Sequence, residues 1–248
     1  MSVRRVPATD LHAQLAMHLG AFGRLSDDDL ANLSNCIARP RRCAVGIDVR
    51  HEASDSPGPW VILMGWVGEG RELSDGRRQL FTVRLPGDVL DPSRGPADME
   101  VTALTTVIFA ELRGLDILLT GQALRNAWRA MHRAERDALY DQVLRLGRLS
   151  AFERTAHLLL ELQERLQRVG MANALEFSLP VSQKVLGDVL GLSIVQVNRT
   201  WQQLRREELI SGQLRDVLIL DRERLAQIAN YGLSHKPVAQ ELRPTRLS

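Results

Sequence analysis

The sequence lacks several features that would assign it to a specialised class of protein. It has only two cysteines among 248 residues, too few for the disulfide scaffold of a secreted domain. No apolar run reaches the length of a membrane span, and the N-terminus lacks the apolar core of a signal peptide. A net charge of only +2 excludes a polybasic nucleic-acid binder. These absences predict a soluble protein of the cytoplasm.

Residues for catalysis and for metal binding are also scarce. His51 is the only histidine in the part of the chain that is rich in β-like sequence, and it stands beside Glu52 in a polar stretch. A metal-binding barrel enzyme needs several His and Glu side chains from neighbouring strands, which one histidine does not supply. No Ser-His-Asp, Cys-His or phosphate-loop arrangement occurs either. The sequence therefore predicts neither an enzyme nor a bound cofactor.

The segment 182–210 has the pattern of a helix-turn-helix. Leu186 and Leu190 lie four residues apart, so both point to one side of a short helix. Between them stands Gly187, where the absence of a Cβ lets a second helix cross closely. Gly191 follows at the usual place for a left-handed helix end. The first helix is thus predicted to end in a tight turn.

A second helix, about Ile194–Arg206, is predicted to follow this turn, with Ser193 as its N-cap. Val197, Trp201 and Leu204 recur at helical spacing and form the face that we expect to be buried. A polar helix braced across a partner helix fits the major groove of DNA. The residues expected to contact DNA are Arg199, Gln196, Asn198, Ser193, Ile194, Val195, Gln183, Gln202 and Arg206.

The alternative is an ordinary helical hairpin, because two amphipathic helices joined by a glycine turn are common. The sequence after the second helix favours DNA binding. Residues 210–220 read as a short strand, a polar tip and a returning strand, which predicts the β-hairpin of a winged helix. From Ser182 onward ten Lys and Arg stand against seven Asp and Glu, whereas the preceding residues carry 22 against 23. Positive charge therefore gathers where phosphate contacts are expected.

The N-terminal part of the chain has a helical pattern. Between about Asp10 and Ala38, Leu15 and Leu19 belong to an amphipathic stripe. Ser26 is then expected to cap a second short helix over 30–37.

A region of β-like sequence extends from about Ala44 to Leu112. Its apolar runs are separated by clusters of Gly, Pro and Asp, which suggests an antiparallel barrel or sandwich. Asp75 and Gly76 are expected to form a hairpin turn. The predicted strand-like runs are Val61–Val67, Gln79–Leu85 and Val101–Leu112.

A long amphipathic helix is predicted over about Ala123–Gly147. Such a stripe on a helix that joins two compact halves suits a two-stranded coiled coil between subunits, although it could instead cover the protein's own β domain. We expect a dimer, because readers of DNA with one helix-turn-helix usually work as two-fold pairs. A further helix, Ala151–Val169, would dock the DNA-binding module onto the long helix. The stripe, which Glu135 interrupts, consists of Leu124, Trp128, Met131, Leu139, Val143 and Leu146.

The order of these elements resembles the Crp/Fnr superfamily of bacterial transcription regulators over essentially the whole chain. Beside the helix-turn-helix, the most specific segments are 73–79 (LSDGRRQ), 85–90 (LPGDVL) and 147–154 (GRLSAFER). The resemblance implies a β-roll that senses a signal and long helices that pair. It also implies recognition helices that enter successive major grooves of a near-palindromic site, and transcriptional control through contact with RNA polymerase.

The cyclic-nucleotide site of the family is not matched here. In members that bind cyclic nucleotides, a segment after the Gly-Asp turn supplies a Glu and an Arg-Ser/Thr pair for the ribose and the phosphate. Met99 and Glu100 stand about where the Arg and Ser would be, and a carboxylate repels an anionic phosphate. We interpret Arg94 as a surface turn residue, and we expect that the roll does not bind cyclic AMP.

The iron-sulfur and haem sensors of the family are not matched either. An iron-sulfur cluster needs four cysteine ligands, which Cys36 and Cys43 cannot supply within one chain. These two could form a redox pair, could be oxidised singly, or could serve as small buried apolar residues. A haem sensor would need an axial ligand, but we expect His51 to be a solvated surface residue.

The recognition helix departs from the well-known cyclic-AMP-responsive members, which carry an Arg and a Glu just after the N-cap. Here Ile194 and Val195 take these positions, and their side chains can only pack on a thymine methyl group. Arg199 keeps the position of the family's second base-contacting arginine, so we expect it to contact a guanine. The polar residues that would read adenine or hold the DNA backbone are Gln196, Asn198, Ser193 and Gln183.

The sequence therefore predicts an α+β protein of three parts. Residues 1–120 form a sensor domain with N-terminal helices and an antiparallel β-roll, a double-stranded β-helix like that of cyclic-nucleotide-binding domains. Residues 121–148 form a dimerisation helix, and residues 149–248 a winged helix-turn-helix domain. The predicted function is that of a homodimeric transcription regulator that binds double-stranded DNA. The alternative is a ligand-binding or interaction module whose helix-turn-helix contacts another protein.

Overall fold

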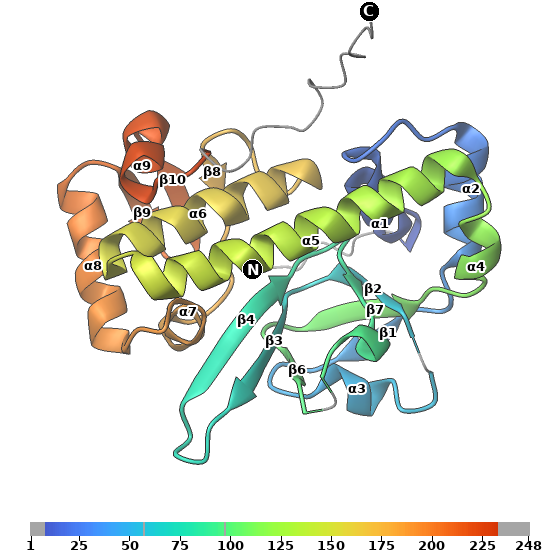
Figure 1. Cartoon of the computed structure of the whole chain (residues 1–248), viewed down its shortest axis with the longest axis horizontal. Helices are drawn as coiled ribbons and strands as arrows, with labels where there is room; N and C mark the ends of the chain where they lie inside the picture. Colours follow the sequence, from blue (N-terminus) through green and yellow to red (C-terminus); the bar gives the residue numbers. More distant parts are fainter. Residues whose placement is uncertain (1–7, 57, 97, 233–248) are drawn as a thin grey trace, which may run out of the picture.

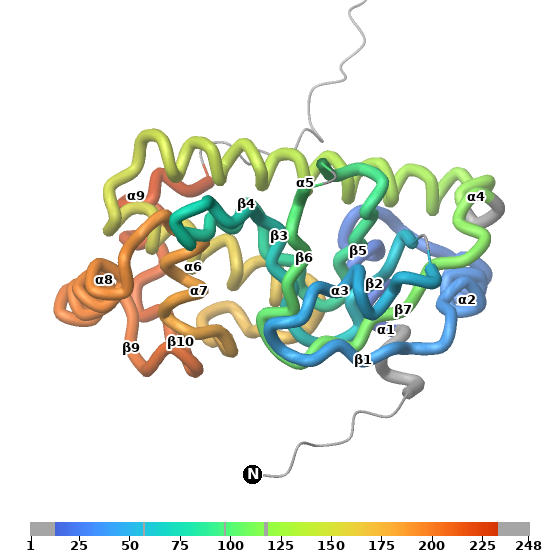
Figure 2. Tube along the Cα trace, turned by 90° about the horizontal axis from the view of Figure 1, so that it is seen from below, coloured from blue at the N-terminus to red at the C-terminus, as the bar shows by residue number. Residues whose placement is uncertain are grey.

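The computed structural model describes residues 8–56, 58–96 and 98–232. The outer ends of the expected sensor and DNA-binding domains, residues 1–7 and 233–248, lie outside these described residues. The long helix α5 (Gln122–Arg148) extends along the molecule and joins a half rich in strands to a half that is mostly helical, as Figures 1 and 2 show. This is the α+β arrangement expected from the sequence.

Two helices precede the strands: α1 (Ala8–Gly20) and α2 (Asp27–Cys36). Ser26 caps α2 as predicted, since its hydroxyl accepts from the Asp29 N–H and its own N–H donates to the Asp29 carboxylate at 3.0 Å. The helix begins at Asp27, earlier than predicted, because the acidic residues after the cap form its first turn, where the helix dipole favours them. Leu15 and Leu19 are fully buried, so the predicted apolar stripe of α1 is confirmed.

The strands of the roll form two antiparallel sheets, with the orders β1-β7-β2-β5 and β4-β3-β6. Buried side chains from both sheets, among them Ile62, Val67 and Phe109, form one apolar cluster inside the roll. The expected antiparallel β-roll is therefore confirmed. Its strands are β1 (Arg41–Cys43), β2 (Trp60–Met64), β3 (Val67–Glu72), β4 (Arg78–Arg84), β5 (Val89–Leu90), β6 (Glu100–Ala103) and β7 (Val107–Glu111).

Two of the predicted strand-like runs are each divided in two, which corrects the sequence interpretation. The run Val61–Val67 is broken at Gly65, which has a φ of +86° and leaves no room for a Cβ beside the carbonyl oxygen of Thr106. The run Val101–Leu112 is likewise divided between β6 and β7. The first break falls within an apolar run, and the second falls at Thr105 and Thr106, a residue type that is itself common in strands, so the pattern alone does not reveal them.

The hairpin predicted at Asp75 and Gly76 is present between β3 and β4. Glu72 pairs with Arg78 across the two strands, and the N–H of Gly76 donates to the carbonyl oxygen of Leu73 at 2.9 Å. Gly76 has a φ of +80°, which a residue without a Cβ adopts readily.

Several short elements were not predicted, because four residues or fewer carry little periodicity. One of them changes an interpretation: His51 lies in a short helix rather than in a loop, although it is exposed as expected. These elements are α3 (Val49–Glu52), the 3-10 helix η1 (Pro92–Arg94), α4 (Leu115–Leu118), β8 (Glu176–Phe177) and the short strands β1 and β5. A longer helix, α9 (Arg222–Ala229), was also missed.

Helix α6 (Ala151–Arg168) follows α5 after a sharp reversal and lies beside it (Figure 1). Ser150 caps it, and the Glu153 carboxylate accepts from the Ser150 N–H at 2.7 Å, which forms a capping box. The buried leucines 158–160 of α6 belong to the apolar core of the C-terminal half, which also includes Leu80 and Leu85 of the roll. Within the described parts of the chain, no helix is both long and apolar enough to cross a membrane.

The apolar stripe of α5 does not face one partner throughout, which corrects the expectation for its first half. Leu124 and Met131 are buried in a cluster with α1, α2 and the roll, and Trp128 packs against that cluster. Leu124 and Met131 therefore cover the protein's own β domain and are not available for a contact between subunits. In the second half Leu139 is 43% exposed and Val143 is 70% exposed.

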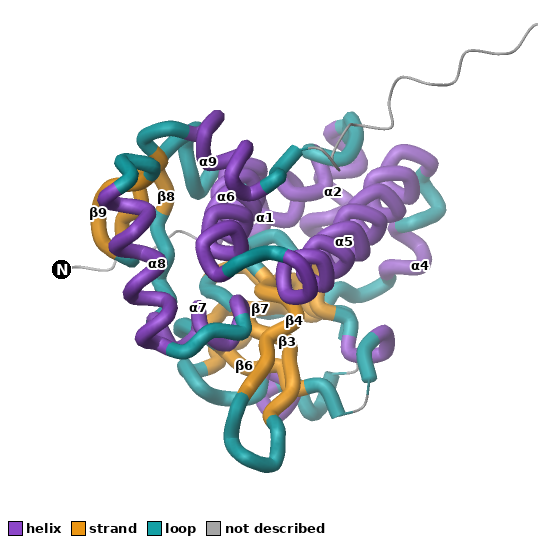
Figure 3. The backbone as a smooth tube through the Cα atoms, turned by 60° about the vertical axis from the view of Figure 1, so that its left-hand side comes forward, coloured by secondary structure: helices purple, strands orange, loops and turns teal. Residues whose placement is uncertain are grey.

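The C-terminal module contains the expected helix-turn-helix and wing. Figure 3 shows its second helix along the outer edge of the molecule. The wing strands pair antiparallel, and the unpredicted β8 extends their sheet in the order β8-β10-β9. The elements are α7 (Gln183–Leu190), α8 (Ile194–Arg206), β9 (Ile210–Gln213) and β10 (Asp216–Ile219).

Candidate DNA-binding interface

The turn between α7 and α8 has the two glycine-dependent features that the sequence predicts. Gly191 ends α7 in the left-handed region, with a φ of +64°. A Cβ on Gly187 would lie 2.5 Å from the carbonyl oxygen of Leu192, so only glycine permits this approach of the chain after the turn. The close contact at Gly187 is thus with the turn rather than with the second helix, whose nearest atom, Cγ2 of Val197, would lie 3.8 Å from the same Cβ.

Ser193 caps α8, as predicted. Its hydroxyl accepts from the N–H of Gln196 at 3.2 Å. In return, the side-chain oxygen of Gln196 accepts from the N–H of Ser193 at 2.9 Å and from its hydroxyl at 3.1 Å. This capping box occupies the amide oxygen of Gln196, so only its amino group is left to face outward. A two-point contact between Gln196 and adenine is therefore not available in this arrangement.

The buried face of α8 fixes which of its residues reach outward. Val197 and Leu204 are fully buried and Trp201 is 6% exposed, and all three belong to the core of the C-terminal half. Because these three residues face the core, the residues on the opposite side of α8 face outward.

The exposed face of α8 brings together the residues that the sequence assigned to DNA contact. Val195, Arg199, Gln202 and Arg206 are exposed and recur at steps of three and four, so they form one continuous stripe. Val195 is 76% exposed, and Ile194 beside it is 48% exposed. Apolar side chains so open to water at the start of a capped helix are available to an apolar partner such as a thymine methyl group.

Asn198 lies at the side of this stripe and is partly buried. Its side-chain oxygen accepts a hydrogen bond from Nε2 of Gln183, at the start of α7, over 2.5 Å. The two predicted contact residues are thus joined to each other across the helix pair, and the amino group of Asn198 remains as a donor.

The cationic side chains of α8 form no ion pair with the part of the chain that the structure describes. Among the ion pairs of the described residues, none involves Arg199, Arg205 or Arg206. The wing adds Arg215, which is exposed between the paired strands β9 and β10. An exposed helix with unpaired guanidinium groups attracts phosphate and can donate to base edges.

The residues that replace the cyclic-nucleotide signature lie at the surface of the roll. Arg94 is exposed in η1, which confirms the interpretation of this residue as a surface arginine. Met99 and Glu100 are partly buried at the start of β6.

The two cysteines are free thiols in different environments. Cys43 is buried in β1 and Cys36 is partly buried at the end of α2. Burial raises the pKa of both thiols, and that of Cys43 to about 11. Because the thiolate is the reactive form, these environments favour the interpretation as small buried residues. In the described part of the chain, no group of three or more His, Cys, Asp and Glu side chains is placed to hold a metal ion.

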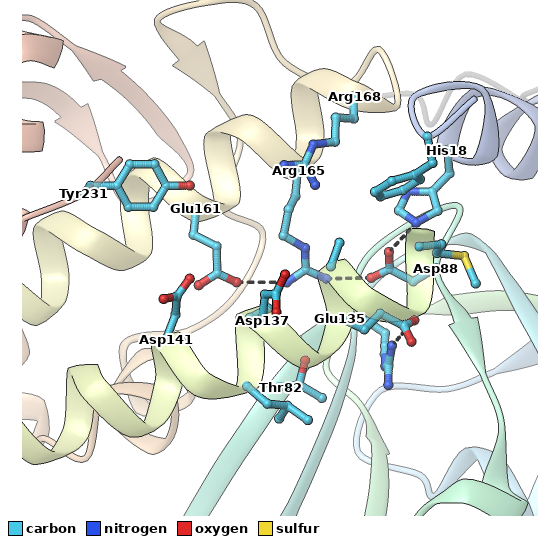
Figure 4. Close-up of a pocket in the computed structure, with 16 residues that line it drawn as sticks. His18, Thr82, Asp88, Glu135, Asp137, Asp141, Glu161, Arg165, Arg168 and Tyr231 are labelled. Atoms are coloured by element: carbon cyan, nitrogen blue, oxygen red, sulfur yellow. Dashed lines mark hydrogen bonds and ion pairs between the residues drawn. The ribbon is translucent and has the colours of Figure 1, made fainter. Parts of the chain in front are cut away.

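A cavity of about 100 Å³ between α1, β4, α5 and α6 was not predicted (Figure 4). Its wall carries a chain of ion pairs that joins the roll to the C-terminal half. Arg165 of α6 binds Asp88 of the roll at 2.6 Å and Glu161 at 3.1 Å, and Nε2 of His18 lies 3.5 Å from Asp88. The one available signal was Glu135 within the apolar stripe of α5, which binds Arg84 at 2.6 Å.

Ion pairing decides the protonation of these buried carboxyl groups. Burial by itself would raise the pKa of Asp88, but the charges of Arg165 and Arg84 hold it below its usual range. The pKa of Glu161 is lowered in the same way, since Arg145 and Arg165 outweigh the effect of burial. Both groups are therefore ionised and paired at neutral pH, and they tie α6 to the roll and to α5.

Comparisons with known proteins agree with this architecture. Residues 153–228 match the family model described as a Crp-like helix-turn-helix domain. The transcriptional activatory protein AadR of Rhodopseudomonas palustris is 33% identical over 63% of this chain and 67% of its own length. The transcriptional activator protein Anr of Pseudomonas protegens is 31% identical over 83% of this chain and 86% of its own.

A solved structure extends the similarity to the fold. FixK2 from Bradyrhizobium japonicum has a TM-score of 0.63 and 28% identity, and the alignment covers 77% of this chain and 96% of that one. Anr is more than 30% identical to this chain over most of the length of Anr, and the DNA-binding domain matches its family model. These relatives are transcription regulators, so the chain does not belong to an enzyme family. The chain belongs to the Crp/Fnr superfamily of bacterial transcription regulators, which bind DNA through this helix-turn-helix.

Proposed function

We propose that two copies of this chain bind one near-palindromic operator, with a helix α8 of each copy in successive major grooves. The observation that carries this proposal is the stripe formed by Val195, Arg199, Gln202 and Arg206. These side chains are exposed on a helix whose opposite face is anchored in the core. A rigid helix that presents apolar, amide and guanidinium groups in one line matches the chemistry of base-pair edges in the major groove.

Individual roles follow from the geometry of α8. Arg199, which has no ion pair among the described residues, would donate two hydrogen bonds to O6 and N7 of a guanine. Val195 and Ile194 would pack on thymine methyl groups. Asn198 would donate from its amino group, because its oxygen is held by Gln183. Arg206 and Gln202 lie further along the stripe, where they would contact the DNA backbone.

The second half of the α5 stripe supports a contact between subunits. Leu139 and Val143 are exposed, and so are the neighbouring Tyr140 (65%) and Leu144 (43%). A patch of large apolar side chains on one long helix is typical of a helix that pairs with a second copy. Leu146, which is partly buried near Gly191, would lie at the edge of this contact.

The remaining parts of the proposal concern regulation. Because the relatives are named as transcriptional activators, this chain would also contact RNA polymerase in the cytoplasm. The roll would sense a signal other than cyclic AMP. Glu100 stands about where the family has a residue that binds the cyclic phosphate, and its carboxylate would repel that phosphate. The residues assigned to sensor, dimer helix and DNA-binding domain would be 1–120, 121–148 and 149–248.

Selection of duplexes from a random library by the purified chain tests this proposal. The expected result is enrichment of a sequence with two related half-sites about one helical turn apart. Its affinity, measured by gel shift, should fall steeply as salt rises from 50 to 200 mM, by about 10³-fold if six phosphates are neutralised. A chain that enriches no sequence would contradict the proposal and favour a helix-turn-helix that contacts protein.

A further inference from the structure

The β3–β4 hairpin of the roll holds the first helix of the helix-turn-helix. Nε and Nη2 of Arg78, at the start of β4, both donate to one carboxylate oxygen of Asp188 in α7, at 3.0 and 2.7 Å. The two side chains are only 15% and 12% exposed. Figure 1 shows α7 beside β4, although more than 100 residues separate them in the sequence. A pair so shielded from water is weakened little by salt.

The C-terminal end of α7 is also held through its backbone. The last four carbonyl groups of a helix have no partner within the helix. In α7 the carbonyl of Asp188 accepts from Nε2 of Gln79 at 2.9 Å, and that of Val189 accepts from Nε2 of Gln142 at 2.7 Å. The carbonyl of Leu190 accepts from Arg154 at 3.2 Å. The roll, α5 and α6 therefore all bind the last helical turn of α7, immediately before the loop that leads to α8.

Helix α8 is in turn joined firmly to α7. Val197 is fully buried in the core that it shares with Leu186 of α7, and the bond between Gln183 and Asn198 links the exposed sides of the two helices. A displacement of β4 would therefore be passed to the recognition helix through α7 as a rigid unit.

We infer that Arg78 and Asp188 are positioning residues for DNA binding, which hold the recognition helix in the orientation that fits its operator and couple it to the roll. This inference rests on the proposed function. Two recognition helices can enter successive grooves only if each is presented in a fixed orientation. If the orientation is already fixed in the free protein, less conformational entropy is lost when the protein binds DNA.

The hairpin supplies its own matched control. Arg77 precedes Arg78 and carries the same charge, but its side chain is 77% exposed, and its ion pair among the described residues is with Asp75 at the tip of the hairpin. Arg77→Ala therefore removes one positive charge from the same loop without touching α7. Arg78→Ala also leaves Asp188 with a second cation, because Nζ of Lys184 lies 3.5 Å from it. The variant is therefore expected to fold.

The test measures binding to a duplex that the unmodified chain has selected from a random library. Arg78→Ala and Asp188→Asn are each expected to lower the affinity about tenfold, within the usual range of coupling between sites. The double variant should bind no more weakly than either single variant, because both changes remove the same contact. Arg77→Ala should bind within about twofold of the unmodified chain.

Hydrogen exchange gives a readout that a contribution to stability alone would not move. DNA binding to the unmodified chain should slow amide exchange in β4, far from the DNA, as well as in α8, since coupling between two sites is reciprocal. In Arg78→Ala the slowing in β4 should disappear while that in α8 remains. Binding of Arg78→Ala equal to that of Arg77→Ala, or stronger than that of the unmodified chain, would overturn the inference. If the unmodified chain selects no duplex, the proposed function itself fails, and this inference fails with it.

Discussion

The amide of Gln183 and the amide of Asn198 form a hydrogen bond of 2.5 Å that connects the start of α7 to the recognition helix. The bond turns the oxygen of Asn198 toward Gln183 and its amino group away from it. One lone pair of the Asn198 oxygen is thus engaged, and its amino group is free to donate toward the DNA. The capping box treats Gln196 in the same way, because Ser193 engages its oxygen. The polar readout of α8 is therefore biased toward hydrogen-bond acceptors on the DNA.

Arg199→Ala is expected to lower the affinity for the selected operator by about 1–3 kcal/mol, because it removes a two-point contact with a guanine. The loss should be largest for the operator and small for unrelated duplexes, since a base contact carries specificity and a phosphate contact does not. Titration of a labelled duplex at fixed salt measures both.

Arg39→Ala is the matched control for this experiment. Arg39 is also an exposed arginine, but it lies in the roll next to β1. Its removal should leave operator binding unchanged. An Arg199→Ala variant that binds the operator as tightly as Arg39→Ala would contradict the assignment of Arg199.

Charged residues in the exposed half of the α5 stripe are expected to separate the subunits. Leu139→Glu combined with Val143→Glu would place two carboxylates against their counterparts in the second copy, without solvation by water. Sedimentation of the variant at micromolar concentration should give a monomer, and that of the unmodified chain a dimer.

Leu73→Glu serves as the comparison, since Leu73 is 52% exposed on the β3–β4 hairpin and outside the stripe. It should sediment like the unmodified chain. A dimer that persists in the Leu139 and Val143 variant would place the subunit contact on another surface.

The helix-turn-helix could be predicted from its sequence because each of its requirements is local. Gly187, Gly191 and Ser193 act on residues at most a few positions away, and Val197 and Trp201 are placed by the period of a single helix. Local rules of this kind, for caps, turns and one-sided burial, are readable without a partner.

The direction in which α5 faces could not be predicted, because it depends on what packs against the helix. Met131 and Val143 belong to one stripe in the sequence, yet Met131 is fully buried against the N-terminal helices and the roll while Val143 is 70% exposed. The ion pair between Asp88 and Arg165 was missed for the same reason, since its residues are 77 positions apart. Periodicity identifies an apolar face but not its partner.

Gly187→Ala is expected to destabilise the C-terminal module by about 1–3 kcal/mol, the range for overpacking of a close contact. The added Cβ would lie 2.5 Å from the carbonyl oxygen of Leu192, a backbone atom that cannot turn away. Urea unfolding followed by the fluorescence of the chain's tryptophans, which include Trp201 in this core, measures the loss.

Gly147→Ala is the opposite case. A Cβ at Gly147, in the last turn of α5, would meet no atom of another element within 4 Å, so the substitution should stabilise the helix by up to about 0.5 kcal/mol. Equal effects of the two substitutions would show that the close contact between Gly187 and the Leu192 carbonyl does not carry the cost assigned to it.

His18→Gln is expected to make the stability of the chain less dependent on pH below about 6.5. Burial lowers the pKa of His18 beneath its ordinary value, against the opposing effect of Asp88, while Arg165 and Arg168 lower it further and Glu135 raises it. The unfolded chain therefore takes up a proton at His18 at a higher pH than the folded chain does. It follows that the stabilisation from neutral His18 is complete above pH 6.5 and is lost as the pH falls below that value.

Urea midpoints at pH 7.5 and 5.5 should differ more for the unmodified chain than for His18→Gln. His51→Gln, which alters an exposed histidine, should retain the full difference. If His18→Gln also retains it, the buried histidine is not the group that titrates.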